Sequence, residues 1–303
     1  MGAGQSHFWL ENDQATMKPT DFRHHHRLRV RWAEVDLQKI VFNPHYLMYL
    51  DCAMSAYWRA LALPYEAAMQ RLGGDTFLRK TTVEFNAPAR IDDELDVALR
   101  CERIGTSSMT FTGAIFRAGQ WLTAGELVYV FADPATQTSQ PVPAPLRALI
   151  EAFEAGQPVT RVQVGDWAAL GEAARTVRQA VFVEEQGIAR DDEWDEADAG
   201  ALHAVVSNLL GMPVATGRLL RDAGAEGQAR VGRMAVDRAL RGSGLGRQVI
   251  AALEQAARAR GDQRIVLSAQ RSAEAFYRRL GYQPYGAPYD EVGIAHIGMA
   301  RAL

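Results

Sequence analysis

The chain has 303 residues, a formal net charge of −3 and 48% hydrophobic residues. This length is typical of two domains, each large enough to bury a core. The slightly acidic balance argues against a nucleic-acid binder, and the two cysteines, Cys52 and Cys101, are too few for a disulfide framework. We therefore expect a protein of a reducing compartment, the cytoplasm, that binds no nucleic acid.

The first 21 residues are polar and are expected to form a disordered or extended tail. Residues 1–6 fit the pattern of an N-myristoylation site. One acyl chain holds a protein to a membrane only weakly, and the sequence shows no second anchor. No apolar run approaches the length of a membrane span. We therefore expect no membrane partner.

The stretch 22–132 predicts an α+β domain. A strand is expected over 26–32, and a long helix over 44–62, with Pro44 in the first turn, where proline is favoured. Apolar residues of this helix recur every three or four positions and predict one buried stripe: Leu47, Leu50, Met54, Tyr57, Trp58 and Leu61. Four strands are expected next, over 77–85, 94–103, 107–117 and 121–131. This order predicts an antiparallel sheet wrapped on a long helix.

Residues 133–158 have the composition of a linker. The segment from Asp133 to Pro145 is rich in Pro, Thr, Ser and Gln, which is typical of loops. A short helix is expected over 146–154, and Gly156 and Pro158 then break it. We place the domain boundary near residue 158 and find no repeat shared by the two halves.

The stretch 159–303 predicts an α/β domain with a mixed sheet. Helices are expected over 167–184, 244–260 and 273–280. Strands are expected over 161–164, 202–208, 214–221, 231–236 and 265–269, with further strands at the end of the chain. The strand–helix–strand order in its second part indicates parallel strands joined by crossovers.

A lone carboxylate, Asp36, lies seven residues before Asn43, at the expected start of the long helix. The free N–H groups and positive dipole end of a helix N-terminus can stabilise a carbonyl oxygen that becomes negative. A nearby carboxylate can attack the carbonyl or activate water. Thioester hydrolysis needs these two parts. The alternative is that Asp36 only stabilises a turn.

Several segments of the first half resemble the 4-hydroxybenzoyl-CoA thioesterase family of hotdog proteins. Asp36, the apolar residues 40–42, Asn43 and Tyr46 match its motif around the start of the helix. Later segments also look like the family's strand pair and the turn that follows: 84–88, 92–97 and 105–108.

This resemblance covers about residues 22–132 and implies a hotdog domain. It implies that Asp36 is the nucleophile or general base and that the N–H of Asn43 polarises the carbonyl. It also implies a site between two subunits, and hence a homodimer or higher homo-oligomer. Lys39 stands where the family often has glycine, so its side chain is expected to narrow the acyl tunnel or change its charge, and the substrate class stays open.

A glycine-rich turn joins the strand expected over 231–236 to the next helix. Small residues let backbone N–H groups approach phosphates, and the helix dipole favours an anion. Arg241 and Arg247 add positive charge. The turn lacks the Gly-Lys-Ser/Thr of a P-loop and the later acidic residue of a dinucleotide-binding fingerprint. From the turn alone, a flexible loop remains the alternative.

The second half resembles the GNAT N-acetyltransferase superfamily over about residues 161–303. The acyl-CoA motif of that superfamily matches Arg241, Gly242, Ser243, Gly244, Leu245 and Gly246. The ElaA-type subgroup is similar at 181–186, 202–203, 275–282 and 289–300. The resemblance implies that 241–246 bind the pyrophosphate of acetyl-CoA and that Met234 and Val236 pair with the pantetheine arm. It also implies that Tyr277 protonates the departing thiolate. The alternative for Tyr277 is a core aromatic with a satisfied hydroxyl.

Acetyl transfer also needs a group that deprotonates the amine. Four residues remain candidates: Glu185, His203, Glu291 and His296. The acidic run 191–198 is expected to be a solvated loop, and the alternative is an acidic mouth that attracts a cationic amine. Histidines 24–26 alternate between faces of a strand, so we expect no metal site there.

The whole sequence predicts a bifunctional acyl-CoA enzyme, a thioesterase followed by an N-acetyltransferase. Acetyl-CoA, acyl-CoA and an amine are the expected small-molecule substrates, with no tightly bound cofactor. One alternative is that only the acetyltransferase is active and the first domain binds acyl-CoA or mediates dimerisation. Another is a CoA-sensing interaction protein. The acyl chain and the amine stay open.

Overall fold

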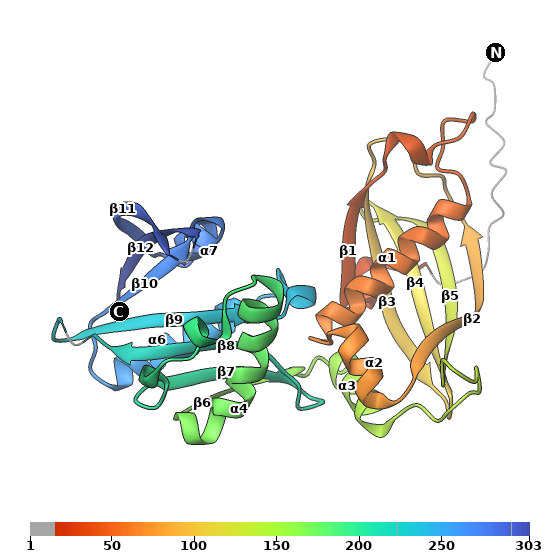
Figure 1. Cartoon of the computed structure of the whole chain (residues 1–303). Coiled ribbons are helices and arrows are strands. Elements are labelled where there is room, and N and C mark those ends of the chain that lie inside the picture. The colour runs from red at the N-terminus through yellow and green to blue at the C-terminus, as the bar shows by residue number, and fades with distance from the viewer. Residues whose placement is uncertain (1–15, 223, 292) are drawn as a thin grey trace, which may run out of the picture. The chain divides into compact units, whose positions relative to one another are not determined.

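The computed structural model describes residues 16–222, 224–291 and 293–303. The chain divides into two compact units, Met1–Pro158 and Val159–Leu303, which are treated separately below (Figure 1). The myristoylation pattern at 1–6 and most of the predicted tail lie outside the described residues. Within these ranges, no helix is long and apolar enough to cross a membrane.

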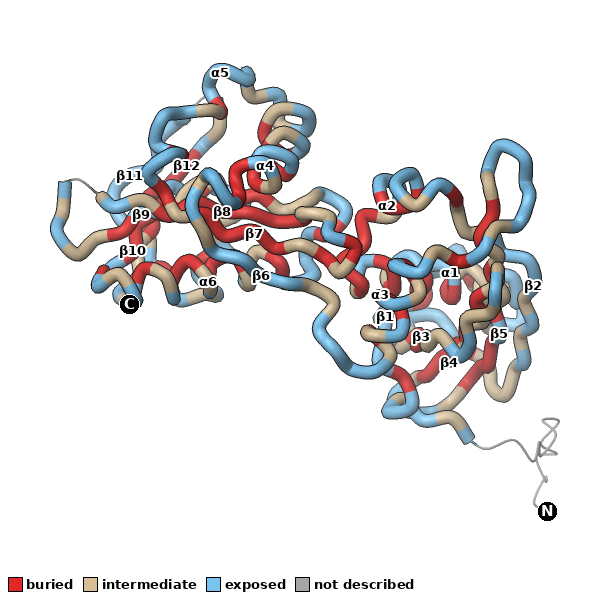
Figure 2. Tube along the Cα trace, turned by 90° about the horizontal axis from the view of Figure 1, so that it is seen from below, coloured by how far each residue is buried: buried red, intermediate tan, exposed pale blue. Residues whose placement is uncertain are grey.

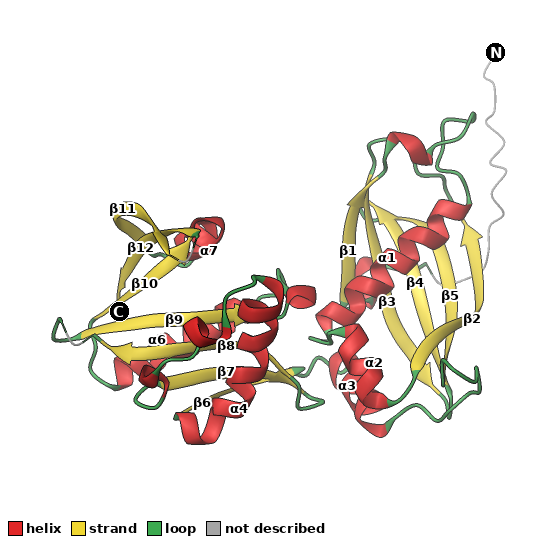
Figure 3. Cartoon of the chain, viewed as in Figure 1, coloured by secondary structure: helices red, strands yellow, loops and turns green. Residues whose placement is uncertain are grey.

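The first unit is a five-stranded antiparallel sheet packed against a long helix, α1 (Pro44–Ala60), as Figure 3 shows. The order of its strands is β1-β3-β4-β5-β2, so β1 and β2 form the two edges. Their bounds are β1 His24–Arg29, β2 Asp75–Phe85, β3 Glu94–Ile104, β4 Ser108–Arg117 and β5 Gln120–Ala132. The predicted hotdog arrangement is confirmed.

Two paired glycines let α1 lie close to the sheet. Gly113 of β4 stands opposite Gly125 of β5. A Cβ at these positions would lie only 2.6 and 2.8 Å from the δ carbons of Leu50, which is fully buried. A side chain at either position would therefore push the helix away. The predicted stripe of α1 is buried except for Leu47, which is half-buried.

The first unit differs from the sequence prediction in three places. β1 ends at Arg29, and Trp32–Glu34 form a 3-10 turn because the Glu34 carboxylate accepts a hydrogen bond from the N–H of Arg31 at 2.8 Å. A helix that was not predicted, α2 (Tyr65–Leu72), follows α1. Helix α3 (Ala144–Glu154), in the predicted linker, buries an apolar face within this unit: Leu146, Leu149, Ile150 and Phe153.

The second unit is a seven-stranded sheet of order β11-β12-β10-β9-β8-β7-β6. It contains both parallel and antiparallel pairs, so the predicted mixed sheet is confirmed. Its strands are β6 Thr160–Gly165, β7 Leu202–Asn208, β8 Pro213–Arg221, β9 Gln228–Val236, β10 Arg264–Gln270, β11 Gln283–Glu291 and β12 Ile294–Ala302. Its helices are α4 Trp167–Arg178, α5 Arg190–Glu193, α6 Leu245–Ala259 and α7 Glu274–Arg279. The central strands are buried along much of their length (Figure 2). After α4 the chain continues as a π-helical turn, Gln179–Glu185, where a single helix was predicted.

The only parallel pair of this sheet in the described residues, β9 and β10, separates part-way along. The two strands are paired from Gln228 and Arg264 to Val231 and Leu267. Beyond these residues β9 runs on to Val236 and β10 to Gln270 without pairing to each other. The sheet therefore opens between their carboxyl ends, where ligands of α/β sheets commonly bind.

Candidate active sites

Asp36 lies in a tight loop of the first unit. Its N–H donates to the Ile40 carbonyl, and its carbonyl accepts from the N–H of Lys39, both at 2.9 Å. The carboxylate oxygen Oδ1 accepts from the N–H of Gln38 at 2.8 Å. In the parts of the chain that the structure describes, the second oxygen, Oδ2, has no partner. Asp36 thus stabilises its turn and still presents a free carboxylate oxygen.

The backbone explains why glycine suits the position of Lys39. Lys39 has φ +63°, in the left-handed region that glycine adopts without strain. Its side chain is exposed. The residue therefore accepts a backbone strain of about 1–2 kcal/mol, and its amino group points to solvent in a single copy of the chain.

Asn43 precedes α1 and supplies an open hydrogen-bond donor. Pro44 has no N–H, the N–H of His45 donates to Phe42 at 2.9 Å, and that of Tyr46 donates to Asn43 at 3.2 Å. Among residues 16–222, 224–291 and 293–303, the N–H of Asn43 finds no acceptor. A carbonyl oxygen bound at this end of α1 would satisfy it.

Glu34 is a functional candidate that the sequence prediction missed. Its carboxylate is buried beside the loop and accepts from the Arg31 N–H at 2.8 Å and the Tyr49 hydroxyl at 2.7 Å. Burial raises the pKa of Glu34, but these hydrogen bonds and the Arg31 guanidinium outweigh it and hold the pKa below its usual range. A carboxylate held by so many donors is suited to fixing the loop. The one sequence feature that could have indicated this role of Glu34 is its three-residue spacing from Arg31.

Three large apolar side chains of the same loop are exposed. Trp32 is 81% exposed, Leu37 fully exposed and Phe42 52% exposed. They flank Asp36 along the chain, so exposed apolar side chains lie on both sides of this carboxylate in the sequence of the loop.

In the second unit, a cavity of about 600 Å³ lies where β9 and β10 separate. Gly232, Arg233 and Met234 line it from β9, and Ser268 and Gln270 line it from β10. Val236 lies further along β9, and its carbonyl accepts from the Arg241 side chain at 3.3 Å.

Tyr277 of α7 also lines this cavity. The ring is buried, yet its hydroxyl has no hydrogen-bond partner within the described residues. Burial raises the pKa of Tyr277 above its usual value, so the phenol stays protonated at neutral pH. An unpaired, protonated hydroxyl in a cavity is available to donate a proton, which disfavours the alternative of a satisfied core tyrosine.

The glycine-rich turn has the backbone of an anion site. Gly242 and Gly244 have φ +86° and +89°. A Cβ on Gly246 would lie 3.2 Å from Phe276, so glycine also lets α6 approach α7. The Ser243 hydroxyl donates to the Leu240 carbonyl at 2.6 Å and shapes the turn. The N–H groups of residues 244–247 find no acceptor in the described ranges and open onto the N-terminus of α6, which begins at Leu245.

The structure separates the four candidate bases. Glu185 binds Arg241 through both oxygens, at 2.7 and 2.6 Å, and this pairing lowers the pKa of Glu185. His203 is buried elsewhere, with Nε2 3.0 Å from the Asp198 carbonyl, and burial lowers its pKa. Glu291 and His296 line the cavity with Tyr277. Of the four candidates, these two are the ones that line the cavity.

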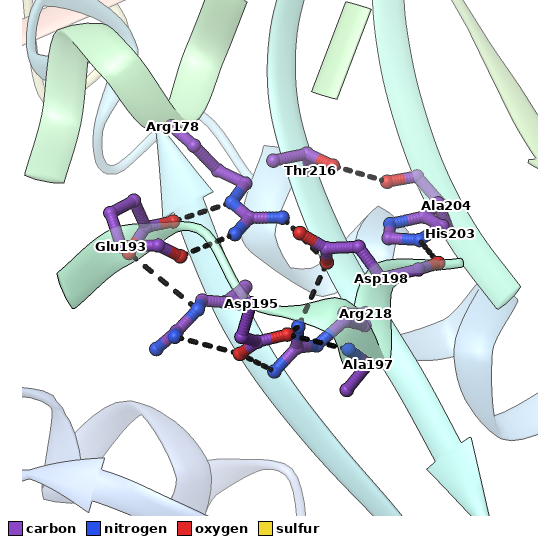
Figure 4. Close-up of polar contacts among 10 residues, drawn as sticks. Arg178, Glu193, Asp195, Ala197, Asp198, His203, Ala204, Thr216 and Arg218 are labelled. Carbon is purple, nitrogen blue, oxygen red and sulfur yellow. Dashed lines mark hydrogen bonds and ion pairs between the residues drawn. The ribbon is translucent and has the colours of Figure 1, made fainter. Parts of the chain in front are cut away.

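The prediction of a solvated acidic loop at 191–198 is wrong for two of its carboxylates, Glu193 and Asp198, whereas Asp195 is exposed and forms ion pairs. Figure 4 shows Arg178 between Glu193, at 2.5 Å, and Asp198, at 2.8 Å. Arg218 bonds Asp198 and Asp195, and Arg233 bonds Asp195 at 3.0 Å. Glu193 and Asp198 are buried, because arginines from α4 and the sheet compensate their charge. Burial nevertheless raises the pKa of Glu193.

Comparisons with known proteins agree with this geometry. The family profile described as "Acetyltransferase (GNAT) domain" matches residues 179–303. The N-acetyltransferase YjcF of Bacillus subtilis is 32% identical over 126 residues, which is 41% of this chain and 87% of that protein. ElaA of Escherichia coli is 35% identical over 132 residues, 42% of this chain and 84% of that protein. The chain belongs to the GNAT acetyltransferase family.

The first unit carries a second family domain. The profile described as "Thioesterase superfamily" matches residues 38–124, so Asp36 lies just before the matched stretch. A crystal structure titled as thioesterase superfamily from Jannaschia is 26% identical, with a TM-score of 0.42, and covers 46% of this chain and 96% of that one. The profile match and the antiparallel sheet packed against a long helix place a hotdog domain similar to the thioesterase superfamily in the first unit.

Proposed function

We propose that this protein is a bifunctional acyl-CoA enzyme. Its first unit hydrolyses acyl-CoA thioesters at Asp36, and its second transfers acetyl from acetyl-CoA to an amine. One observation carries the proposal: each unit holds, at its predicted site, a hydrogen-bond donor that no described residue uses. In the first unit the donor is the Asn43 N–H, and in the second it is the Tyr277 hydroxyl itself. Two unpaired cysteines, Cys52 and Cys101, fit a reducing compartment such as the cytoplasm.

For hydrolysis, the N–H of Asn43 polarises the thioester carbonyl at the N-terminus of α1. The free carboxylate oxygen of Asp36 attacks the carbonyl carbon or takes a proton from attacking water. If Asp36 activates water, the water oxygen bonds to the carbonyl carbon, the C–S bond breaks, and the proton held by Asp36 passes to the thiolate to give the acid and CoA thiol. If Asp36 attacks, the C–S bond breaks to give an acyl–Asp36 anhydride and CoA thiolate, and water then hydrolyses the anhydride to the acid and supplies the proton of the thiol. The exposed apolar residues around Asp36 support a homodimer or higher homo-oligomer in which a second hotdog unit completes the acyl site.

For acetyl transfer, the pyrophosphate of acetyl-CoA binds the turn 241–246 and the free N–H groups of 244–247 at the N-terminus of α6, and Arg241 leaves Glu185 to join it. The pantetheine arm lies along β9 at Met234 and Val236. His296 takes a proton from the ammonium group, and the free amine attacks the acetyl carbonyl. As the C–S bond breaks, Tyr277 protonates the thiolate. The second proton on nitrogen restores the Tyr277 hydroxyl.

The narrower alternative, that only the acetyltransferase is active, has one observation in its favour. The Asp36 carboxylate already accepts a hydrogen bond from the N–H of Gln38, so stabilising the turn is enough to account for this residue. The first unit would then bind acyl-CoA or mediate dimerisation.

Thiol release from a panel of acyl-CoAs, with and without a mixture of amines, tests the proposal. We expect release from some acyl-CoAs without amine, and further release from acetyl-CoA when amine is added. Tyr277→Phe should slow the amine-dependent part about 100-fold without changing the melting temperature, because the lost hydroxyl has no partner. Amine-dependent release that survives in Tyr277→Phe would contradict the role of Tyr277.

A further inference from the structure

One wall of the cavity in the second unit carries polar residues that do not bind acetyl-CoA in the proposal above. On β10, Ser268 and Gln270 are two residues apart and face the same side of the sheet. Gln270 stands opposite His296 of β12, and His296 stands opposite Tyr289 of β11. Glu291, two residues after Tyr289, faces the same side. These strands adjoin α7, which carries Tyr277 (Figure 1).

The contacts on this wall orient the Glu291 carboxylate and leave Nε2 of His296 without a hydrogen-bond partner among the described residues. The Ser268 hydroxyl bonds the Tyr289 hydroxyl and donates to Oε2 of Glu291 at 3.1 Å. The Tyr289 ring stacks on His296 with centroids 6.1 Å apart. Nδ1 of His296 lies 2.7 Å from the Ile294 carbonyl, so Nδ1 carries the proton. Nε2 can therefore accept a proton, and no described residue forms a hydrogen bond with it.

The ion pairs around the cavity leave two of its carboxylates without a cationic partner in the described ranges. Arg218 and Arg233 are held by the acidic residues of Figure 4, and Arg230 pairs with Asp222 at 3.2 Å. Two carboxylates that line the cavity, Asp192 and Glu291, have no arginine or lysine within 4.0 Å in the described ranges.

The lining residues themselves contain three arginines, Arg218, Arg230 and Arg233, and three carboxylates, Asp192, Glu193 and Glu291. Because each of these arginines is already paired with a carboxylate, Asp192 and Glu291 are the charges left to a ligand, and they attract cations and repel carboxylates.

We propose that the acetyl acceptor is an aliphatic diamine, a primary amine with a second ammonium group and no carboxylate. This inference rests on the acetyl transfer proposed above and names its substrate class. Glu291, oriented by Ser268, holds the reacting ammonium group beside Nε2 of His296. Asp192 pairs with the second ammonium group.

The chemistry balances with two protons removed from the reacting nitrogen. The first passes to Nε2 of His296 and then to solvent, which frees the nitrogen lone pair to form the N–C bond. The C–S bond breaks with its electron pair on sulfur, and sulfur takes the proton of Tyr277. The second proton on nitrogen restores Tyr277. The products are the monoacetylated diamine, CoA thiol and one proton.

Three probes of matched length test the inference on the full chain: 1,4-diaminobutane, 1-aminobutane and 4-aminobutanoate. We expect kcat/KM with acetyl-CoA to fall in that order, by about tenfold at each step. Glu291→Gln should raise KM for the diamine about tenfold and leave KM for acetyl-CoA unchanged. Glu172→Gln, on the exposed surface of α4, is the matched control and should change neither value. Preference for 4-aminobutanoate, or equal behaviour of the two variants, would overturn the inference.

Calorimetric binding separates this inference from the proposed function. Acetyl-CoA that neither binds nor reacts would refute acetyl transfer. Binding of 1,4-diaminobutane to the wild type that weakens in Glu291→Gln but not in Glu172→Gln would still support the diamine site. Equal binding to all three proteins, or none to the wild type, would refute that site whatever acetyl-CoA does.

Discussion

The two candidate sites of this chain are built in opposite ways. In the first unit, Asp36 lies on a surface loop among exposed apolar residues, and the N–H of Asn43 at the start of α1 has no acceptor in the described residues. In the second unit, Tyr277 and His296 line a cavity between strands that separate, backed by a buried network of arginines and carboxylates. A loop site depends on whatever covers it, whereas the cavity between the diverging strands is lined by residues of the second unit alone. Thioester hydrolysis in the first unit should therefore depend on oligomerisation. Acetyl transfer in the second unit should depend on the charged residues inside that unit.

The largest expected effect separates the two roles of Asp36. Asp36→Asn keeps an oxygen that can accept from the Gln38 N–H but removes the negative charge. We expect thioester hydrolysis to fall about 1000-fold, with acetyl transfer unchanged. Asp51→Asn, an exposed position on α1, should leave both rates unchanged. If Asp36→Asn hydrolyses thioesters at the wild-type rate, Asp36 only stabilises its turn and is not the catalytic residue of the first unit.

The second prediction tests the buried network. Arg178→Met leaves Glu193 and Asp198 buried without their main partner, which should lower the free energy of unfolding of the second unit by about 3–5 kcal/mol. Arg175→Met, on the exposed face of the same helix, should cost less than about 1 kcal/mol. Denaturant unfolding measures both, and thioester hydrolysis should persist in each variant. Equal losses would mean that the network adds no stability.

The third prediction concerns acid stability of the first unit. His24 is buried with Nε2 3.1 Å from the Ala53 carbonyl, and burial lowers its pKa from 6.5 to about 4. Between these values the unfolded chain binds a proton that the folded chain does not, so stability falls as pH falls from 6.5 to 4. The loss should reach about 3 kcal/mol. His24→Gln should flatten this dependence, and an unchanged slope would contradict the assignment.

The fourth prediction tests whether the loop site needs assembly. Phe77 and Leu78 are each 42% exposed on β2, an edge strand. Phe77→Lys should shift sedimentation toward the monomer and lower thioester hydrolysis about tenfold, as expected for an apolar anchor lost from an interface. Acetyl transfer should not change, and Arg79→Lys on the same strand serves as the control. Monomeric Phe77→Lys with full hydrolysis would show that one hotdog unit suffices.

The smallest effect is expected at Lys39. Lys39→Gly should raise the free energy of unfolding by about 1 kcal/mol, because glycine relieves the left-handed backbone. Gln38→Gly has no such strain to relieve and should instead lose about 0.5–1 kcal/mol. KM for acyl-CoA in Lys39→Gly then tests the prediction that this side chain narrows the acyl tunnel. A lower KM would support that prediction, and an unchanged KM would contradict it.

Local patterns were enough to predict most elements of the fold. The helix that begins at Pro44 and the strand over 202–208 followed from apolar spacing and are found at those positions. The helix Tyr65–Leu72 was missed because it has only two buried residues, Ala68 and Met69, and so no clear apolar stripe. The π-helical turn after Arg178 depends on tertiary packing and has no local pattern.

The candidate sites also combine features that local sequence could predict with features that it could not. The turn around Gly244 could be predicted because its backbone conformation requires glycine. The pairing of Arg178 with Glu193 and Asp198 could not, because residues 15 and 20 positions apart meet only through the packing of separate elements. The same holds for Ser268 and Glu291, whose side chains meet across β12. Sequence spacing could name Glu291 and His296 as candidate bases but could not rank them.

The central claim is that one chain carries two independent CoA-dependent activities. Thiol release should be measured for the wild type, Asp36→Asn and Tyr277→Phe, with and without 1,4-diaminobutane. We predict that Asp36→Asn loses only amine-independent release from acyl-CoAs and that Tyr277→Phe loses only amine-dependent release from acetyl-CoA. Loss of both activities in either variant, or of neither activity in both variants, would contradict two separate active sites.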